Sequence, residues 1–436
     1  MVLFEYASLS ATLLCGAAVL LWATALLPEY QTALLFFLLA VVLGIAPPEV
    51  AFSGFSSPAL WLVFSGLVVG LAIQRTSLGE RFSRIFLALA PTNYFGVLTA
   101  LVLLGFALSF FMPSSMGRVV MIVPIAVLVT DQLGMTHGSR SRGVLIATAA
   151  LGAYLPSASI LPANIPNLIL ASGAESLYGI QFRYADYFVA TFPTIGFGKL
   201  VLIIATGMLL SSGAVRVRPS LEPMGPMHAD ERKLTTILIA TVALWATDAM
   251  HGINPAWIGL AAAIACLLPR FGMLSEKSFN HEISWAPLIH TAGIIGLGAV
   301  VAASGLGEGL GRILTDIAPF ATGYTFWNFM LLVVILTVIC LMTTTPGFPA
   351  VATPLAGSIA EASGLPLQTV LLSQALAFST IIFPYQGAPL VFAFYVAGVP
   401  FRTAVKVLMI ITIGSILIIA PLTYIWWRTI GILPRG

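Results

Sequence analysis

Four short polar segments interrupt otherwise apolar stretches of this sequence, and their residue types could bind a small solute. They are residues 113–118, 162–167, 343–347 and 384–389. Non-helical backbone at membrane depth must line a cavity or be buried in protein. Each segment offers free N–H groups at a helix start, which attract anions, and free carbonyl oxygens, which coordinate cations. The pattern therefore predicts a binding site for a small ionic solute.

Polar side chains and glycines in these segments are the candidate substrate ligands. They are Ser114, Ser115, Gly117, Arg118, Asn164, Asn167, Thr344, Thr345, Gly347 and Gln386. Hydroxyls and amides give neutral, directional contacts. In the simpler alternative, Gly and Pro only kink helices here, and Ser and Thr bond back to their own backbone. Four such segments at corresponding positions favour a binding site.

Arg118 is the one basic residue expected at membrane depth. A central arginine costs about 2.5–3.5 kcal/mol on insertion scales. Arg118 could be a fixed positive charge for an anionic substrate or a stand-in for a bound cation. Alternatively, it could reach water or tie down a loop. Asp248 is expected to be a helix-end or packing residue rather than a proton carrier, and His290 is expected at the membrane interface.

The composition indicates a membrane protein. The chain has 436 residues, of which 59% are hydrophobic and 8% are charged, whereas soluble domains carry about 25% charged residues. The net charge of +3 gives no nucleic-acid signature. No Ser/His/Asp, metal-ligand or nucleotide-binding pattern appears, so we expect neither an enzyme nor a resident cofactor.

The apolar segments are long enough for roughly ten membrane spans of about 20 residues each. They lie at 10–28, 31–47, 57–74, 94–130, 143–174, 191–211, 234–250, 254–270, 284–304, 322–360, 367–398 and 403–427. A polar stretch at 212–233 reads as a linker. In each half the fourth segment predicts a re-entrant helical hairpin and the fifth a broken helix.

Short motifs repeat between the halves in the same order, 222–230 residues apart. Residues 21–24 recur at 244–247, 78–80 at 306–308, 114–117 at 344–347 and 162–164 at 384–386. Five full spans in each half are an odd number of membrane crossings. The second half would therefore begin on the opposite face of the membrane from the first. The expected fold is therefore an all-α membrane protein with two inverted repeats of five transmembrane helices plus a re-entrant hairpin each.

The distribution of Lys and Arg predicts the orientation, because these residues are in excess on the cytoplasmic side. With both termini on one side, five basic residues share that side: Arg183, Lys199, Arg312, Arg428 and Arg435. Thirteen lie in the opposite loops: Arg75, Arg81, Arg84, Arg140, Arg142, Arg216, Arg218, Arg232, Lys233, Arg270, Lys277, Arg402 and Lys406. Both termini are therefore expected outside the cell, with the protein in a bacterial inner membrane.

Parts of the sequence resemble the divalent anion/sodium symporters. These parts are residues 21–28, 32–35 and 62–79, together with residues 285–306, which are the second-half counterpart of 62–79. The resemblance implies an elevator-type homodimer. The scaffold of each subunit would contain residues 1–90 and 234–320. The moving domain would contain residues 91–233 and 321–436. The family usually has one more helix before the first of these, and we expect this chain to lack it.

The resemblance also implies sodium sites at the hairpin tips and broken helices. Candidate sodium ligands are Ser114, Ala163, Asn164, Thr344 and Tyr385. The family carries a Ser-Asn-Thr signature at each tip, whereas the matching residues here are Ser-Ser-Met at 114–116 and Thr-Thr-Pro at 344–346. These departures leave the coupling ion open between sodium, a proton and none.

Together these observations predict a secondary active transporter of small anions, such as dicarboxylates, sulfonates or oxyanions, working by an elevator mechanism. The expected partners are the anionic substrate, the lipid bilayer and a second copy of the chain. The alternative is an ion-coupled antiporter or exporter of the same superfamily. A channel or an intramembrane enzyme is a rival from another class. Direction of transport stays open.

Overall fold

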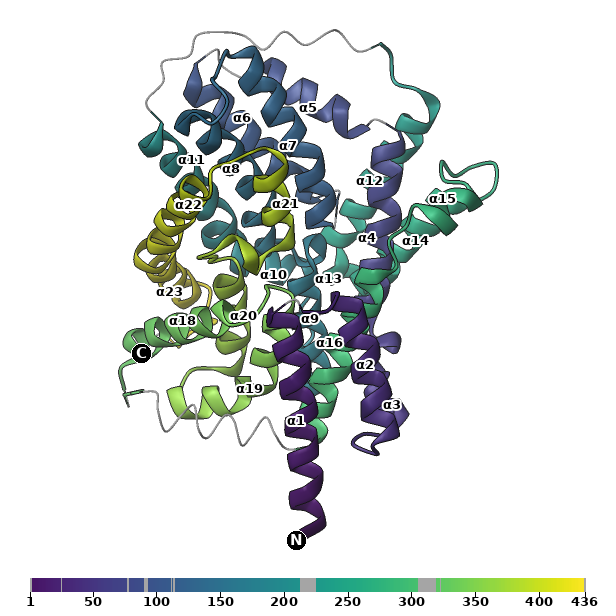
Figure 1. Cartoon of the computed structure of the whole chain (residues 1–436), viewed down its shortest axis with the longest axis vertical. Coiled ribbons are helices and arrows are strands. Elements are labelled where there is room, and N and C mark those ends of the chain that lie inside the picture. The colour runs from purple at the N-terminus through teal and green to yellow at the C-terminus, as the bar shows by residue number, and fades with distance from the viewer. Residues whose placement is uncertain are drawn as a thin grey trace.

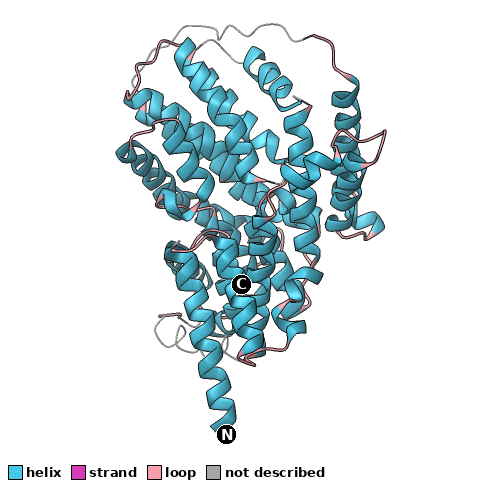
Figure 2. Ribbon diagram, turned by 45° about the vertical axis from the view of Figure 1, so that its right-hand side comes forward, coloured by secondary structure: helices cyan, strands magenta, loops and turns pink. Residues whose placement is uncertain are grey.

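The apolar segments form helices in a computed structural model of the chain, and no β-strand occurs in the part that the structure describes (Figure 2). That part covers residues 2–24, 26–76, 78–89, 93–110, 112, 114–211, 225–304, 319–321 and 323–434. Most of the predicted linker, the repeated motif at 306–308 and Pro113 lie outside it. By length and composition, four described helices could cross a membrane: Pro58–Arg75, Ser115–Gln132, Tyr184–Leu210 and Phe401–Thr429. Seven more apolar helices of 10–17 residues accompany them.

In the first half, the helices follow the predicted segments closely. They are α1 (Val2–Thr24), α2 (Glu29–Val42), α3 (Pro48–Ala51), η1 (Ser53–Ser56), α4 (Pro58–Arg75), α5 (Leu78–Leu89), α6 (Tyr94–Ala107), η2 (Leu108–Phe110), α7 (Ser115–Gln132), α8 (Arg140–Tyr154), η3 (Pro156–Ser159), η4 (Leu161–Ala163), α9 (Ile165–Tyr178), α10 (Tyr184–Thr191), η5 (Phe192–Gly198) and α11 (Lys199–Leu210).

The second half also contains both long and interrupted helices. It contains α12 (Ala229–Ala246), α13 (Asp248–His251), α14 (Pro255–Leu267), α15 (Glu276–His281), α16 (Ala286–Ala303), α18 (Thr325–Leu341), α19 (Gly347–Ser363), α20 (Leu367–Phe378), η6 (Pro384–Gln386), α21 (Ala388–Val396), α22 (Phe401–Gly414), η7 (Ser415–Ile419) and α23 (Ala420–Thr429). A helix begins within each of the four predicted interruptions.

One boundary differs from the sequence prediction. The polar stretch at 212–233 was expected to be a linker throughout, but α12 already begins at Ala229. The Glu231 carboxylate accepts a hydrogen bond from the His228 N–H at 2.9 Å, which caps the helix. It also pairs with Arg81 at 2.9 Å. These contacts let a charged first turn join the helix.

The helices pack in two groups. α4 packs against α14, and α2 against α16, while α6 and α7 pack on α8, and α18 on α20. In Figure 1, α2, α4, α12 and α14 lie on the right, and α6, α8, α11, α18 and α22 on the left. α9 and α19 contact each other and also α16, so they form the boundary between the groups.

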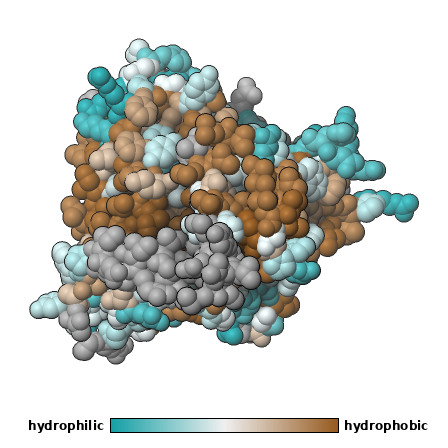
Figure 3. Space-filling model, turned by 60° about the horizontal axis from the view of Figure 1, so that its bottom comes forward, coloured by the Kyte–Doolittle hydropathy of each residue, from teal (hydrophilic) through white to brown (hydrophobic). Residues whose placement is uncertain are grey.

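Large apolar side chains also cover the outside of the molecule. Leu20, Leu209, Met342 and Leu417 are each more than 60% exposed. Figure 3 shows broad hydrophobic surface with hydrophilic side chains toward its margins. Such a surface suits contact with lipid hydrocarbon rather than water.

Candidate functional site

The first interruption holds Ser114, which starts α7. The Ser114 hydroxyl accepts a hydrogen bond from the Gly117 N–H at 3.1 Å, so it caps the helix as serine commonly does. The neighbouring Ser115 hydroxyl accepts from the Arg118 guanidinium at 3.1 Å. Both predicted serines are therefore engaged with their own turn of helix.

Arg118 is buried completely and holds three segments together. Its Nε donates to the Ala153 carbonyl at 2.9 Å, and its Nη1 donates to the Ala163 carbonyl at 2.7 Å and to the Met112 carbonyl. These carbonyls belong to the end of α8, to the interruption at residues 162–167, which we call the first break, and to the residue just before the interruption at 113–118, which we call the first tip. Arg118 forms no ion pair with a carboxylate among the described residues. It does not reach water, and its positive charge stays inside the protein.

The two asparagines of the first break have different surroundings. Asn164 caps α9 by accepting from the Asn167 N–H at 3.0 Å, and its amide donates to the Ser157 hydroxyl at 3.2 Å. The Asn167 amide donates to the Ile160 carbonyl at 2.7 Å and accepts from the Tyr187 hydroxyl at 3.1 Å. Asn167 is thus fully engaged in shaping the break.

The interruption at residues 343–347 (the second tip) and the interruption at residues 384–389 (the second break) are joined directly by a hydrogen bond. The Thr345 N–H donates to the Gln386 carbonyl at 2.8 Å, and the Thr344 hydroxyl accepts from the Gly347 N–H at 3.3 Å. The Gln386 side-chain oxygen accepts from the N–H groups of Ile382 and Phe383 at 2.8 and 3.0 Å. The buried Gln386 amide therefore shapes its own loop.

A small cavity of about 220 Å³, including its open mouth, lies beside the first break and the second tip. It is lined by Tyr154, Leu155, Ala158, Asn164, Pro166, Thr345, Phe378 and Ser379. These residues come from the end of α8, the first break, the second tip and the end of α20. We call this the central cavity. Of the predicted substrate ligands only Asn164 and Thr345 line it; the other eight lie in or next to the surrounding tips and breaks.

Tyr154 is a central residue that the sequence did not reveal. Its hydroxyl lies 2.7 Å from the Thr345 hydroxyl, so it links α8 to the second tip. Its ring also packs on Gly387, where an added Cβ would lie 2.8 Å from the tyrosine oxygen. One signal was available in the sequence: Tyr154 is a polar aromatic residue in the apolar segment 143–174, upstream of the break at 162–167.

The candidate sodium ligands already take part in hydrogen bonds within the protein. The Ala163 carbonyl already accepts from Arg118 at 2.7 Å. Tyr385 is half exposed, and its hydroxyl donates to the Leu341 carbonyl at 2.7 Å. Ser114 and Thr344 accept from their own helix N–H groups. A cation placed next to the Ala163 carbonyl would therefore be repelled by the Arg118 guanidinium, since like charges repel strongly where screening is weak.

Two expectations about charged residues were wrong. Lys199 was placed in a loop on the side of the termini, and Arg118 was taken as the one basic residue at depth. Lys199 is instead fully buried at the start of α11. His290 is buried, with its Nδ1 2.9 Å from the Glu29 carboxylate; its place at the membrane interface stays a prediction. Asp248, as expected, meets a helix end: it accepts from the Tyr184 N–H at 2.5 Å.

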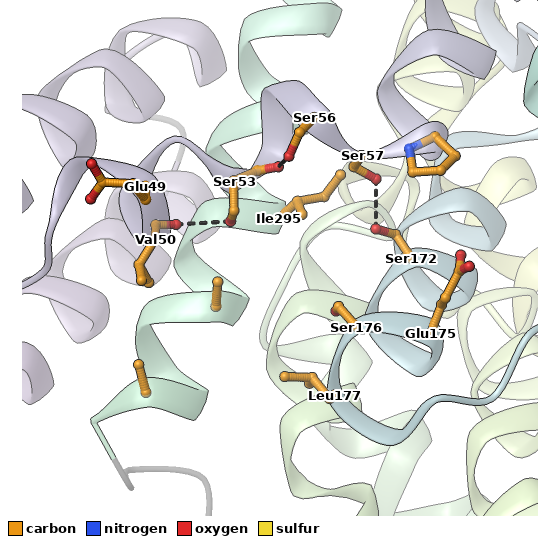
Figure 4. Close-up of a pocket in the computed structure, with 13 residues that line it drawn as sticks. Glu49, Val50, Ser53, Ser56, Ser57, Ser172, Glu175, Ser176, Leu177 and Ile295 are labelled. Atoms are coloured by element: carbon orange, nitrogen blue, oxygen red, sulfur yellow. Dashed lines mark hydrogen bonds between the residues drawn. The ribbon is translucent and has the colours of Figure 1, made fainter.

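A second, larger cavity opens between the two helix groups (Figure 4). It holds about 1190 Å³ including its open mouth. Serines from both sides line it, and the Ser57 and Ser172 hydroxyls lie 2.7 Å apart across the contact between α4 and α9. Glu49 and Glu175 stand at its walls. Sequence reasoning did not predict this crevice, because residues that meet across it, such as Ser57 and Ser172, are 115 residues apart in the chain.

Comparisons with known proteins agree with this architecture. The model of the sodium:sulfate symporter transmembrane region matches residues 5–433. A membrane protein of Cupriavidus necator is 25% identical over 321 residues, or 68% of this chain, and the chain spans 62% of that relative's length. An L-tartrate/succinate antiporter of Escherichia coli is 24% identical over 78% of this chain and 72% of its own.

A solved structure shares the fold. The YdaH transporter of Alcanivorax borkumensis superposes with a TM-score of 0.59 over 88% of both chains, at 16% identity. At that identity the likeness concerns the fold alone.

Proposed function

Because the chain belongs to the divalent anion:sodium symporter family, we propose that it is a secondary active transporter of small anions that binds its substrate at the central cavity. One observation carries the proposal. The end of α8, the first break, the second tip and the end of α20 line this cavity, and a buried guanidinium, which has no carboxylate partner among the described residues, donates to the Ala163 carbonyl next to the Asn164 wall. Such a site attracts negative charge through helix N-termini and a fixed cation.

The residues have distinct roles in this proposal. Asn164 and Thr345 would contact the anion, and Tyr154 would hold the second tip against the first break. Arg118 does not line the cavity, but it lies directly behind the lining residues. From there it would supply the positive charge that a sodium ion otherwise brings to an anionic substrate. We therefore propose that the first break works without sodium.

An elevator motion suits the two helix groups. α1–α5 and α12–α16 would form the scaffold, corresponding to 1–90 and 234–320. The remaining helices, in 91–233 and 321–436, would form the moving domain as an inverted repeat. The crevice of Figure 4 lies along the boundary between the two. Such a scaffold would pair with a second copy, giving a homodimer.

The alternative is an antiporter or exporter at the same site. The curated relative from Escherichia coli is named for exchange of L-tartrate and succinate, which favours carboxylates among the candidate anions. A channel would differ by passing current far above transporter turnover.

We expect a dianion to stabilise the purified protein in the absence of sodium. A ligand that binds only the folded state raises the melting temperature. The measurement is a thermal-shift screen of dicarboxylates, sulfonates and oxyanions, each as its potassium and its sodium salt. Stabilisation by neutral or cationic solutes, with none by any anion, would contradict the proposal.

We also expect both termini outside the cell and residues 212–233 inside, because Lys and Arg cluster on one side. Because Lys199 is buried rather than in a loop, it no longer counts among the basic residues on the side of the termini, and the charge bias becomes stronger. The native cysteines Cys15, Cys266 and Cys340 are first replaced. Single cysteines replacing Ser220 and Gly436 are then treated with an impermeant thiol reagent in intact cells. Labelling of the cysteine at 220, with none at 436, would show the opposite orientation.

A further inference from the structure

A second basic side chain is buried next to the central cavity. Lys199 has no exposed surface. Its Nζ donates to the Ser379 hydroxyl at 2.7 Å, to the Thr380 hydroxyl at 3.0 Å and to the Ser379 carbonyl. It forms no ion pair with a carboxylate anywhere in the described part of the chain. Ser379 itself lines the central cavity. The Lys199 ammonium therefore lies directly behind the cavity wall, in contact with a residue that forms it.

The oxygens around Lys199 belong to the end of a broken helix. α20 ends at Phe378, and Ser379 follows it as the C-cap. The C-terminal end of a helix carries a partial negative charge. Unwound carbonyls at such ends are where transporters with broken helices coordinate coupling cations. Lys199 fills such a position with an ammonium group of its own.

Arg118 has the corresponding place in the first half. Its Nε donates to the Ala153 carbonyl at 2.9 Å, one residue before the end of α8. Each broken helix therefore ends on a buried side-chain cation that comes from a different helix. The two cations lie behind different walls of the central cavity, Arg118 behind Asn164 and Lys199 behind Ser379. Neither lines the cavity itself.

We infer that Lys199 is a built-in cation that takes the place of a coupling sodium ion at the second break. The inference rests on the proposed function, in which the central cavity takes an anion. Together with Arg118, it makes the cavity suited to a small dianion without sodium at either break. A sodium ion beside the ammonium would meet strong repulsion in a weakly screened site. The rival explanation is that Lys199 only caps α20.

The first test removes the side chain. Lys199→Ala leaves the hydroxyls of Ser379 and Thr380 and the Ser379 carbonyl facing an empty space that a small cation could fill. We expect sodium chloride, compared with choline chloride at equal ionic strength, to raise the melting temperature of Lys199→Ala by a few degrees. The wild type and Lys406→Ala, which removes an exposed charge, should show no such shift. This readout needs no substrate.

The second test separates charge from helix capping. Lys199→Gln keeps an N–H donor for Ser379 but carries no charge, and Lys199→Arg keeps the charge. With succinate and sulfate as probes in potassium buffer, we expect Lys199→Gln to bind about tenfold or more weakly, and Lys199→Arg to bind more tightly than Lys199→Gln. If Lys199→Ala does not fold, the comparison of Lys199→Gln with Lys199→Arg decides whether the charge of Lys199 or only its capping of α20 matters.

Three results would overturn the inference. They are a sodium-specific shift in the wild type, no shift in a folded Lys199→Ala, and unchanged anion binding by Lys199→Gln. If the wild type binds neither probe, the proposed function fails instead, and the sodium measurement on Lys199→Ala still decides the role of Lys199.

Discussion

Replacing Arg118 with glutamine is expected to destabilise the protein by about 3–5 kcal/mol and to remove anion binding. The buried guanidinium satisfies carbonyls at Met112, Ala153 and Ala163. Hydrogen bonds to charged groups contribute about 1.5–3 kcal/mol each, and buried acceptors left without a donor are costly. A glutamine side chain is shorter and can reach at most part of this set.

Two measurements check this prediction. The melting temperature in detergent reports stability, and anion-induced shifts of that temperature report binding. Arg75→Gln is the matched control, because Arg75 pairs with Glu282 at an exposed position, and exposed pairs contribute little. A folded Arg118→Gln with unchanged melting temperature and unchanged anion binding would show that this guanidinium supports neither the break nor the site.

The second large effect is expected from a single methyl group at Gly387. An added Cβ would lie 2.8 Å from the Tyr154 oxygen and 3.0 Å from its Cζ. Gly387 has φ −133°, which any residue adopts, so the effect is steric rather than conformational. Overpacking of this kind costs typically about 1–3 kcal/mol. Gly387→Ala should displace Tyr154 from Thr345 and weaken anion binding about tenfold or more.

A double-mutant cycle isolates that contact. Tyr154→Phe removes the hydroxyl that the new methyl group meets first, so Gly387→Ala should be less destabilising in that background than in the wild type. Gly16→Ala serves as the control, because its Cβ would meet nothing within 4 Å and lies on an exposed helical face. Additive effects of Gly387→Ala and Tyr154→Phe would rule out the proposed contact.

The sequence predicted the interruptions well, because glycine, proline and hydroxyl residues inside apolar stretches have local consequences. Helices restart at Ile165 and Ala388, inside the expected segments 162–167 and 384–389, but they end earlier than expected, at Tyr154 and Phe378. The periodic apolar segments likewise located most helices. These features depend on neighbouring residues, which is why one sequence suffices to predict them.

The side-chain roles depended on distant partners and were predicted less well. Lys199 finds its acceptors 180 residues away at Ser379, and Tyr154 finds Thr345 191 residues away. No local pattern marks such pairs. Conversely, Asn167 and Gln386 look like substrate ligands in the sequence, yet their amides are engaged with nearby backbone.

Solute counterflow in proteoliposomes tests the central claim most directly. Vesicles loaded with unlabelled succinate, and others with sulfate, are diluted into sodium-free choline buffer containing a trace of the labelled anion. We expect the wild type to accumulate at least one labelled dianion, and the Asn164→Ala/Thr345→Val variant, which alters two cavity-lining side chains, to lose most of that accumulation while remaining folded. Accumulation that strictly requires sodium, or that is unchanged in the double variant, would contradict an anion site at the central cavity with its own internal cations.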